Sequence, residues 1–230
     1  MTTSRLVAAT LLGIYRPVVL WFWTTMTVCA VVGMTAIALS GEPTFSLWLL
    51  MAGSAAKYWL GVVGATLVSL NLRQFVANGI TRREFLAGAA IFGLSATVVF
   101  AVAVVAGHGV EQLLLGLDGP LPAGYPTMTP GTALREFGQI LPSALAFLVA
   151  GAAVTAGFYR FGAWGGLALL PAAVLPLAAA ETLFGLDASL GFAVRFVPYA
   201  AAVLITLAVT ALGVLLYQRV LRDVTIRPAG

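Results

Sequence analysis

The sequence predicts an all-α bundle of six transmembrane helices, with the N and C termini in the cytoplasm. Three observations predict it: a shortage of charge, apolar runs of membrane-spanning length, and arginines on alternate connections. Of the 230 residues, 9% are charged and 61% are hydrophobic, whereas a soluble domain carries about 25% charged residues. So few charged residues cannot cover the surface of a soluble globular protein, so we expect the chain to lie in a lipid bilayer. We expect residues 1–230 to form one transmembrane domain.

Six runs have the length of a membrane helix, which needs about 20 mostly apolar residues. We expect spans at about 17–41, 45–72, 85–107, 137–159, 161–180 and 196–218. Membrane β-strands are disfavoured, because they give shorter alternating segments of about 10 residues.

Two longer connections and one flank complete the chain. Residues 108–134 contain several prolines and glycines, which predict an irregular outer loop. Residues 181–195 form the second outer loop, with a short half-helix expected around Leu186–Leu190. Before the first span, Ser4–Tyr15 is expected to lie at the membrane interface.

The arginines predict the orientation. With the N-terminus inside, nine arginines are cytoplasmic and two are outside, which follows the positive-inside rule. The nine are Arg5, Arg16, Arg73, Arg82, Arg83, Arg160, Arg219, Arg222 and Arg227. The use of arginine instead of lysine favours a bacterial source, so we expect a bacterial cytoplasmic (inner) membrane. A cleaved signal peptide is the alternative for the first span, but its apolar run exceeds the 7–15 residues of a signal core.

The connection between the second and third spans, residues 73–85, has a defined predicted geometry. The second span is long enough for its helix to leave the membrane and end near Asn78. Gly79 then follows the helix, where glycine adopts the left-handed conformation without a Cβ penalty. Thr81 and Glu84 have the spacing of a capping box, so the third span should start at Arg82. We call this cytoplasmic helix–glycine–helix turn the elbow.

The elbow resembles the coupling segment of ABC-2-type permeases, the six-span membrane subunits of ATP-driven exporters. The resemblance rests on Gln74-Phe75 and on the run from Asn78 to Phe85, in which Gly79-Ile80-Thr81-Arg82 matches that family's Gly-x-Ser/Thr-Arg stretch. The basic tail Tyr217–Thr225 and the six-span layout are also similar. The resemblance implies transport by alternating access, driven by a separate cytoplasmic ATPase subunit and shared with a second permease copy or paralogue.

By the same resemblance, the partner-coupling residues lie in the elbow. They are Arg73, Gln74, Phe75, Asn78, Gly79, Thr81, Arg82, Arg83 and Phe85. A purely structural interpretation also accounts for the segment, since membrane helices must turn and arginines anchor a cytoplasmic turn.

Lys57 is the one charge within a predicted span, and an intramembrane charge is by default a functional hypothesis. Its amine can instead reach the headgroups or form a structural pair. Pro171 and Pro176 fall in the fifth span and each removes a helix hydrogen bond. Bent helices either line a transport path or fit their neighbours, and we take Lys57, Pro171 and Pro176 as the candidate substrate path.

The sequence offers little for catalysis in this chain. It has no phosphate-binding Gly-x4-Gly-Lys-Ser/Thr motif, so ATP and Mg are expected on the partner subunit and no cofactor is expected here. Cys29 is the only cysteine and His108 the only histidine; we expect His108 to be an interfacial polar residue and expect no metal site. The basic residues form no soluble patch for nucleic acid, and membrane lipid is the expected surrounding.

Two other functions remain open at this point. A six-span substrate-binding subunit for vitamin uptake has a similar length and would hold one ligand tightly. A non-transporting membrane anchor or immunity protein would bind a partner without a nucleotide-driven change of shape.

Overall fold

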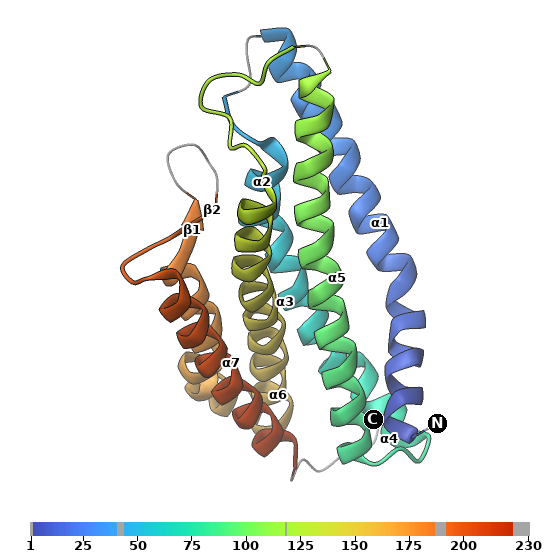
Figure 1. The fold of residues 1–230 in the computed structure, drawn as a ribbon. Helices are drawn as coiled ribbons and strands as arrows, with labels where there is room; N and C mark the ends of the chain where they lie inside the picture. The colour runs from blue at the N-terminus through green and yellow to red at the C-terminus, as the bar shows by residue number, and fades with distance from the viewer. Residues whose placement is uncertain (1, 41–43, 118, 187–191, 223–230) are drawn as a thin grey trace.

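The computed structural model describes residues 2–40, 44–117, 119–186 and 192–222. Within these ranges the chain is almost entirely helical, and five helical segments are long and apolar enough to cross a membrane. The helices run roughly along one axis, with the elbow at one end and a short β-hairpin toward the other, where α1 and α5 extend beyond it (Figure 1). The all-α prediction and the multi-pass membrane character therefore agree with the structure, apart from the hairpin. We refer to the elbow end and the hairpin end of the bundle.

Helix α1 (Thr3–Ser40) is continuous through Pro17. The stretch Ser4–Tyr15 is therefore the first part of α1 and not a separate element, and its place at the membrane interface stays a prediction. Val7, Leu11 and Tyr15 recur at a spacing of four residues and are all buried, so this stretch packs on the protein and continues the helix. Farther along, α1 is the least buried span: 6% of its most apolar window is covered, against 67% in α6.

The second helical segment runs from Leu47 to Ala77 without interruption. It consists of α2 (Leu47–Met51), α3 (Lys57–Thr66) and α4 (Arg73–Ala77), joined by two π-helical turns at Ala52–Ala56 and Leu67–Leu72. π-Helical turns are rare and are frequently found at functional sites. Here one precedes Lys57 and the other precedes the elbow.

Helix α5 (Arg82–Gly116) extends well beyond its predicted end at residue 107. Residues 108–134 are therefore not one irregular loop, because helix occupies both ends of the stretch. The next helix, α6 (Pro130–Leu183), begins with Thr129 as its N-cap and a proline in its first turn, where the missing N–H has no partner to lose. Among the described residues only 117 and 119–129 are non-helical in this connection.

Helix α6 is broken at Gly162, whose φ of 71° and ψ of −166° are not helical. Figure 1 shows the two arms of α6 running in opposite directions on either side of this break. They pack against each other, since a Cβ at Gly166 would lie 2.5 Å from the Phe158 ring. The predicted boundary between residues 159 and 161 falls at this turn.

The first arm of α6 packs closely against α3 through glycines. A Cβ at Gly151 would lie 1.9 Å from the carbonyl oxygen of Gly61, and a Cβ at Gly64 would lie 2.0 Å from the carbonyl oxygen of Leu148. Only glycine allows backbones to approach this closely, as at many membrane helix interfaces.

Two short antiparallel strands, β1 (Phe184–Leu186) and β2 (Phe192–Val194), follow α6. Leu186 is extended, so the predicted half-helix around Leu186–Leu190 is wrong at its first residue, and 187–191 lie outside the described residues. The last helix, α7 (Tyr199–Arg222), packs mainly on α6.

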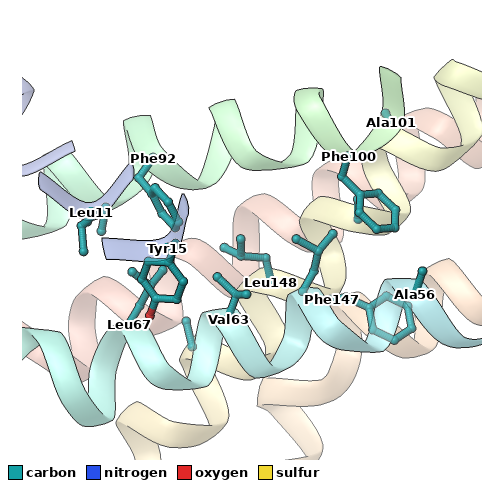
Figure 2. Packing of buried hydrophobic residues seen from close by; sticks show 14 of the residues in the cluster. Leu11, Tyr15, Ala56, Val63, Leu67, Phe92, Phe100, Ala101, Phe147 and Leu148 are labelled. Atoms are coloured by element: carbon teal, nitrogen blue, oxygen red, sulfur yellow. The ribbon is translucent and has the colours of Figure 1, made fainter. Parts of the chain in front are cut away.

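The core lies between α1, α3, α5 and the first arm of α6 (Figure 2). In Figure 2 the Tyr15 and Phe92 rings lie side by side, with centroids 5.1 Å apart. Phe147 is buried beside α3 and meets the Tyr58 ring edge-on at 5.0 Å. This core connects α1 with α3, α5 and the first arm of α6.

Candidate functional site

The first half of the elbow is a helix stop of the Schellman type. The Ile80 amide donates to the Phe75 carbonyl at 3.1 Å and the Gly79 amide to the Val76 carbonyl at 3.0 Å. Gly79 has a φ of +83°, the left-handed conformation that this motif requires. Ile80 and Phe75 both pack on the core, which supplies the apolar contact that accompanies the motif. The predicted left-handed conformation of Gly79 after the helix is confirmed, and its part in partner coupling stays a prediction.

The second half of the elbow is a complete capping box. The Glu84 amide donates to the Thr81 hydroxyl at 3.3 Å, and the Thr81 amide donates to the Glu84 carboxylate at 3.0 Å. Hydrogen bonds from the Thr81 side chain and backbone, and from the Thr3 side chain, hold the pKa of Glu84 below its ordinary value. Helix α5 starts at Arg82 as predicted. Two successive caps leave little conformational freedom between α4 and α5.

Most of the predicted coupling residues lie at the surface of the protein. Arg73, Gln74, Asn78, Gly79, Thr81 and Arg83 are exposed, and Phe75 and Arg82 are half-buried. Phe85 is fully buried with its ring 5.5 Å from that of Phe75. It cannot touch a partner, so any part it has in coupling is to hold the elbow's shape.

Arginines also bind the carboxyl end of α7, a feature that the sequence did not predict. The Arg82 guanidinium donates to the Arg222 carbonyl at 3.1 Å. The Arg160 guanidinium donates to the carbonyls of Arg219 and Val220 at 3.0 and 2.8 Å. The last carbonyls of a helix lack helical partners and carry partial negative charge. These bonds join the elbow and the turn near Gly162 to the end of α7.

The start of α1 packs on the helix that leaves the elbow. A Cβ at Gly88 would lie 2.5 Å from the Val7 side chain and 2.8 Å from the Ser4 carbonyl oxygen. Within the second π-helical turn, the Asn71 amide donates to the Tyr15 hydroxyl at 2.9 Å. Within the elbow itself, Glu84 accepts from Thr3 of α1 and Arg82 donates to Arg222 of α7, so the elbow and the helix turns next to it contact both α1 and α7.

Lys57 lies in the hairpin-side half of the bundle and is paired. Its ammonium forms an ion pair with Glu181 near the end of α6. It also lies 5.5 Å from the centre of the Phe147 ring and 5.8 Å from that of Tyr58, within the range of cation–π attraction. The structural-pair interpretation of Lys57 agrees with this geometry.

A small cleft opens beside Lys57. Its volume of about 30 Å³ has room for about one water molecule. The buried amide of Gln139 lines it, and the Oε1 atom of that amide has no hydrogen-bond partner among the described residues. Phe184 and Phe192 of the hairpin form one wall. In this conformation the cleft is polar on one side and too small for an organic substrate.

The two prolines of the candidate path lie elsewhere. Pro176 is buried against α7, where a Cβ at Gly213 would lie 2.7 Å from its ring, and Pro171 is exposed. Neither lines the cleft beside Lys57. The structure therefore does not bring Lys57, Pro171 and Pro176 into one cavity of a single chain, and their place on a substrate path stays a prediction.

Comparison of the chain with protein-family profiles, with curated proteins and with solved structures gives no match.

Proposed function

We propose that this chain is the membrane-spanning permease subunit of an ABC-type exporter in a bacterial cytoplasmic membrane. A separate ATPase subunit, which carries ATP and Mg, docks on the elbow and drives alternating access. The chain crosses the membrane six times, because the arms of α6 on either side of Gly162 cross separately. The second arm, residues 163–183, is about 32 Å long at 1.5 Å per residue, close to the roughly 30 Å of a bilayer core.

The observation that carries the proposal is the double-capped elbow and its bonds to the rest of the bundle. A loop that merely turned the chain would need no such rigidity. The hydrogen bond from Arg82 to α7, and the contact of Gly88 with Val7 of α1 one turn beyond the elbow, make the elbow and the start of α5 a junction. Force applied there would reach α1, α5 and α7 together.

The cytoplasmic face of this junction is basic. Arg73 and Arg83 are exposed on the elbow, and both termini are cytoplasmic in the proposed orientation. An acidic groove on the ATPase would complement this charge and guide docking. Closure of two ATPase subunits around ATP would then tilt the helices of two permease copies, and the transport path would lie between the copies.

The test is a pull-down from native membranes in mild detergent, with an ATPase assay on the eluate. Arg73→Glu with Arg83→Glu reverses two exposed charges without touching the bond from Arg82 to α7. The matched control is Arg135→Glu, which reverses a charge at the hairpin end. We expect ATPase activity to co-purify with the wild type and the control and to be lost from the double variant. A chain that brings down no ATPase would contradict the proposal and favour an anchor or immunity-type protein.

A further inference from the structure

His108 is the most deeply buried titratable side chain at the hairpin end. Its side chain is fully covered, although the sequence predicted an interfacial polar residue. It lies on α5, one turn before Glu111 and Gln112, and faces both the 119–129 segment and the start of α6. No group of three metal-ligating side chains occurs among the described residues, so this histidine is not explained by a metal site.

Both ring nitrogens of His108 face an oxygen that accepts hydrogen bonds. Nδ1 lies 3.1 Å from the Glu136 carboxylate and Nε2 lies 2.9 Å from the Pro126 carbonyl. A carbonyl can only accept, and a neutral imidazole has a single N–H. When Glu136 is ionised and His108 is neutral, only one ring nitrogen can donate. The lone pair of the other nitrogen then faces the oxygen of Glu136 or of Pro126 without a hydrogen bond.

Two protonation states of the His108–Glu136 pair give both ring nitrogens and both oxygens a hydrogen bond, and the two states contain the same number of protons. In one, His108 is an imidazolium that donates to both oxygens. In the other, a protonated Glu136 donates to Nδ1 while Nε2–H donates to Pro126. The pair thus holds one proton more than a neutral imidazole beside a carboxylate, and that proton belongs to the pair as a whole.

We infer that His108 and Glu136 form a proton-binding site that closes the 119–129 segment over the hairpin end of the bundle. The bound proton lies between the α5 and α6 side chains. When it is lost, the single N–H of His108 donates to the Glu136 carboxylate, because an ionised carboxylate is a stronger acceptor than a carbonyl, and Pro126 loses its donor. Glu136 is slightly exposed, with 11% of its side chain accessible, which gives the proton a way out.

The other ionisable groups near the pair keep their own hydrogen-bond or ring partners, so a pH response of the 119–129 segment is assigned to the pair. From the segment, the Tyr125 ring lies 6.0 Å from His108, and burial, followed by the charge of Glu111, raises the pKa of its hydroxyl. Tyr125 therefore stays protonated and keeps donating to Glu111 at 3.0 Å. Glu111 on α5 also accepts from the Ser46 hydroxyl and the Trp48 amide.

Of the remaining charges, Arg135 on α6 points toward α7, with its guanidinium 5.4 Å from the Tyr199 ring. Met128 hydrogen-bonds with Gln112, which does not titrate. Loss of the proton therefore loosens the segment between the Tyr125 and Met128 contacts, where Pro126 and Thr127 lie.

A nitroxide at position 127 tests this inference. Thr127 is exposed, and Cys29→Ser removes the native thiol. We expect the label on Thr127→Cys to be immobile at low pH and at least twofold more mobile at high pH, in a series from about pH 5 to about pH 9. A label on Leu134→Cys, exposed on α6, should not change.

Glu136→Gln distinguishes a proton site from a structural contact. A glutamine amide donates to Nδ1 without titrating, and a neutral His108 then donates from Nε2 to Pro126. The 119–129 segment of this variant should stay closed at high pH. His108→Ala should leave it open at every pH, and Glu111→Gln should keep the pH response. A pH-independent wild type, or a Glu136→Gln variant that opens as the wild type does, would overturn the inference.

Discussion

Gly151→Ala should drive α3 and the first arm of α6 apart. The new Cβ would lie 1.9 Å from the carbonyl oxygen of Gly61, and side-chain carbons essentially never approach closer than 3.0 Å. The two helices would have to separate by about 1.1 Å, and the neighbouring contact of Gly64 with Leu148 would open as well. Overpacking of this kind typically costs about 1–3 kcal/mol.

The matched control is Gly13→Ala in α1, where no atom lies within 4 Å of the new Cβ. There alanine should be neutral or stabilising by up to about 1 kcal/mol, because it favours the helix. Thermal unfolding in detergent, followed by tryptophan fluorescence, measures both. At about 2–4 °C per kcal/mol for a chain of this size, Gly151→Ala should lower Tm by several degrees. Equal Tm values for the two variants would refute the close helix contact.

Three further predictions concern the ion pair and the elbow. Lys57→Met leaves the Glu181 carboxylate unpaired and should cost about 1–3 kcal/mol in unfolding free energy, whereas adding Glu181→Leu should restore most of it; equal stability of the single and double variants would argue against the pair. Gly79→Ala places a Cβ at a φ of +83° and should cost about 1–2 kcal/mol, read from the same melts; an unchanged Tm would argue against the left-handed turn. The pKa of Glu84 is lowered by Thr81, so the carboxylate's stabilising contribution is present above its ordinary value near 4.5 and is lost as pH falls through the lowered pKa. Hydrogen exchange at the start of α5 should show that loss in the wild type and not in Thr81→Ala.

The elbow could be predicted from sequence because its rules are local. Gly79 ends one helix through bonds that reach back three and five residues, and Thr81 with Glu84 begins the next through bonds that span three. Backbone geometry alone fixes such short distances. The same holds for the turn near Gly162, where apolar runs on either side of Arg160 predicted a boundary between two helical stretches.

The contacts at the hairpin end could not be predicted, because they join distant residues. Lys57 pairs with Glu181, and His108 pairs with Glu136 across a loop. The prolines and glycines of residues 108–134 predicted an irregular loop, but His108, Glu111 and Gln112 each find a partner in the returning 119–129 segment, and α5 continues to Gly116. The bond from Arg82 to Arg222 likewise depends on how helices far apart in sequence meet.

The most direct test of ATPase docking is photo-crosslinking from the elbow in intact membranes. Gln74 is exposed on α4 and would carry the photoreactive amino acid, with Ala123, exposed at the hairpin end, as the control position. We predict a crosslinked species from position 74, but not from position 123, whose second component is a nucleotide-binding ATPase by mass spectrometry. Crosslinks from position 74 only to lipid, or to proteins that bind no nucleotide, would contradict the permease proposal.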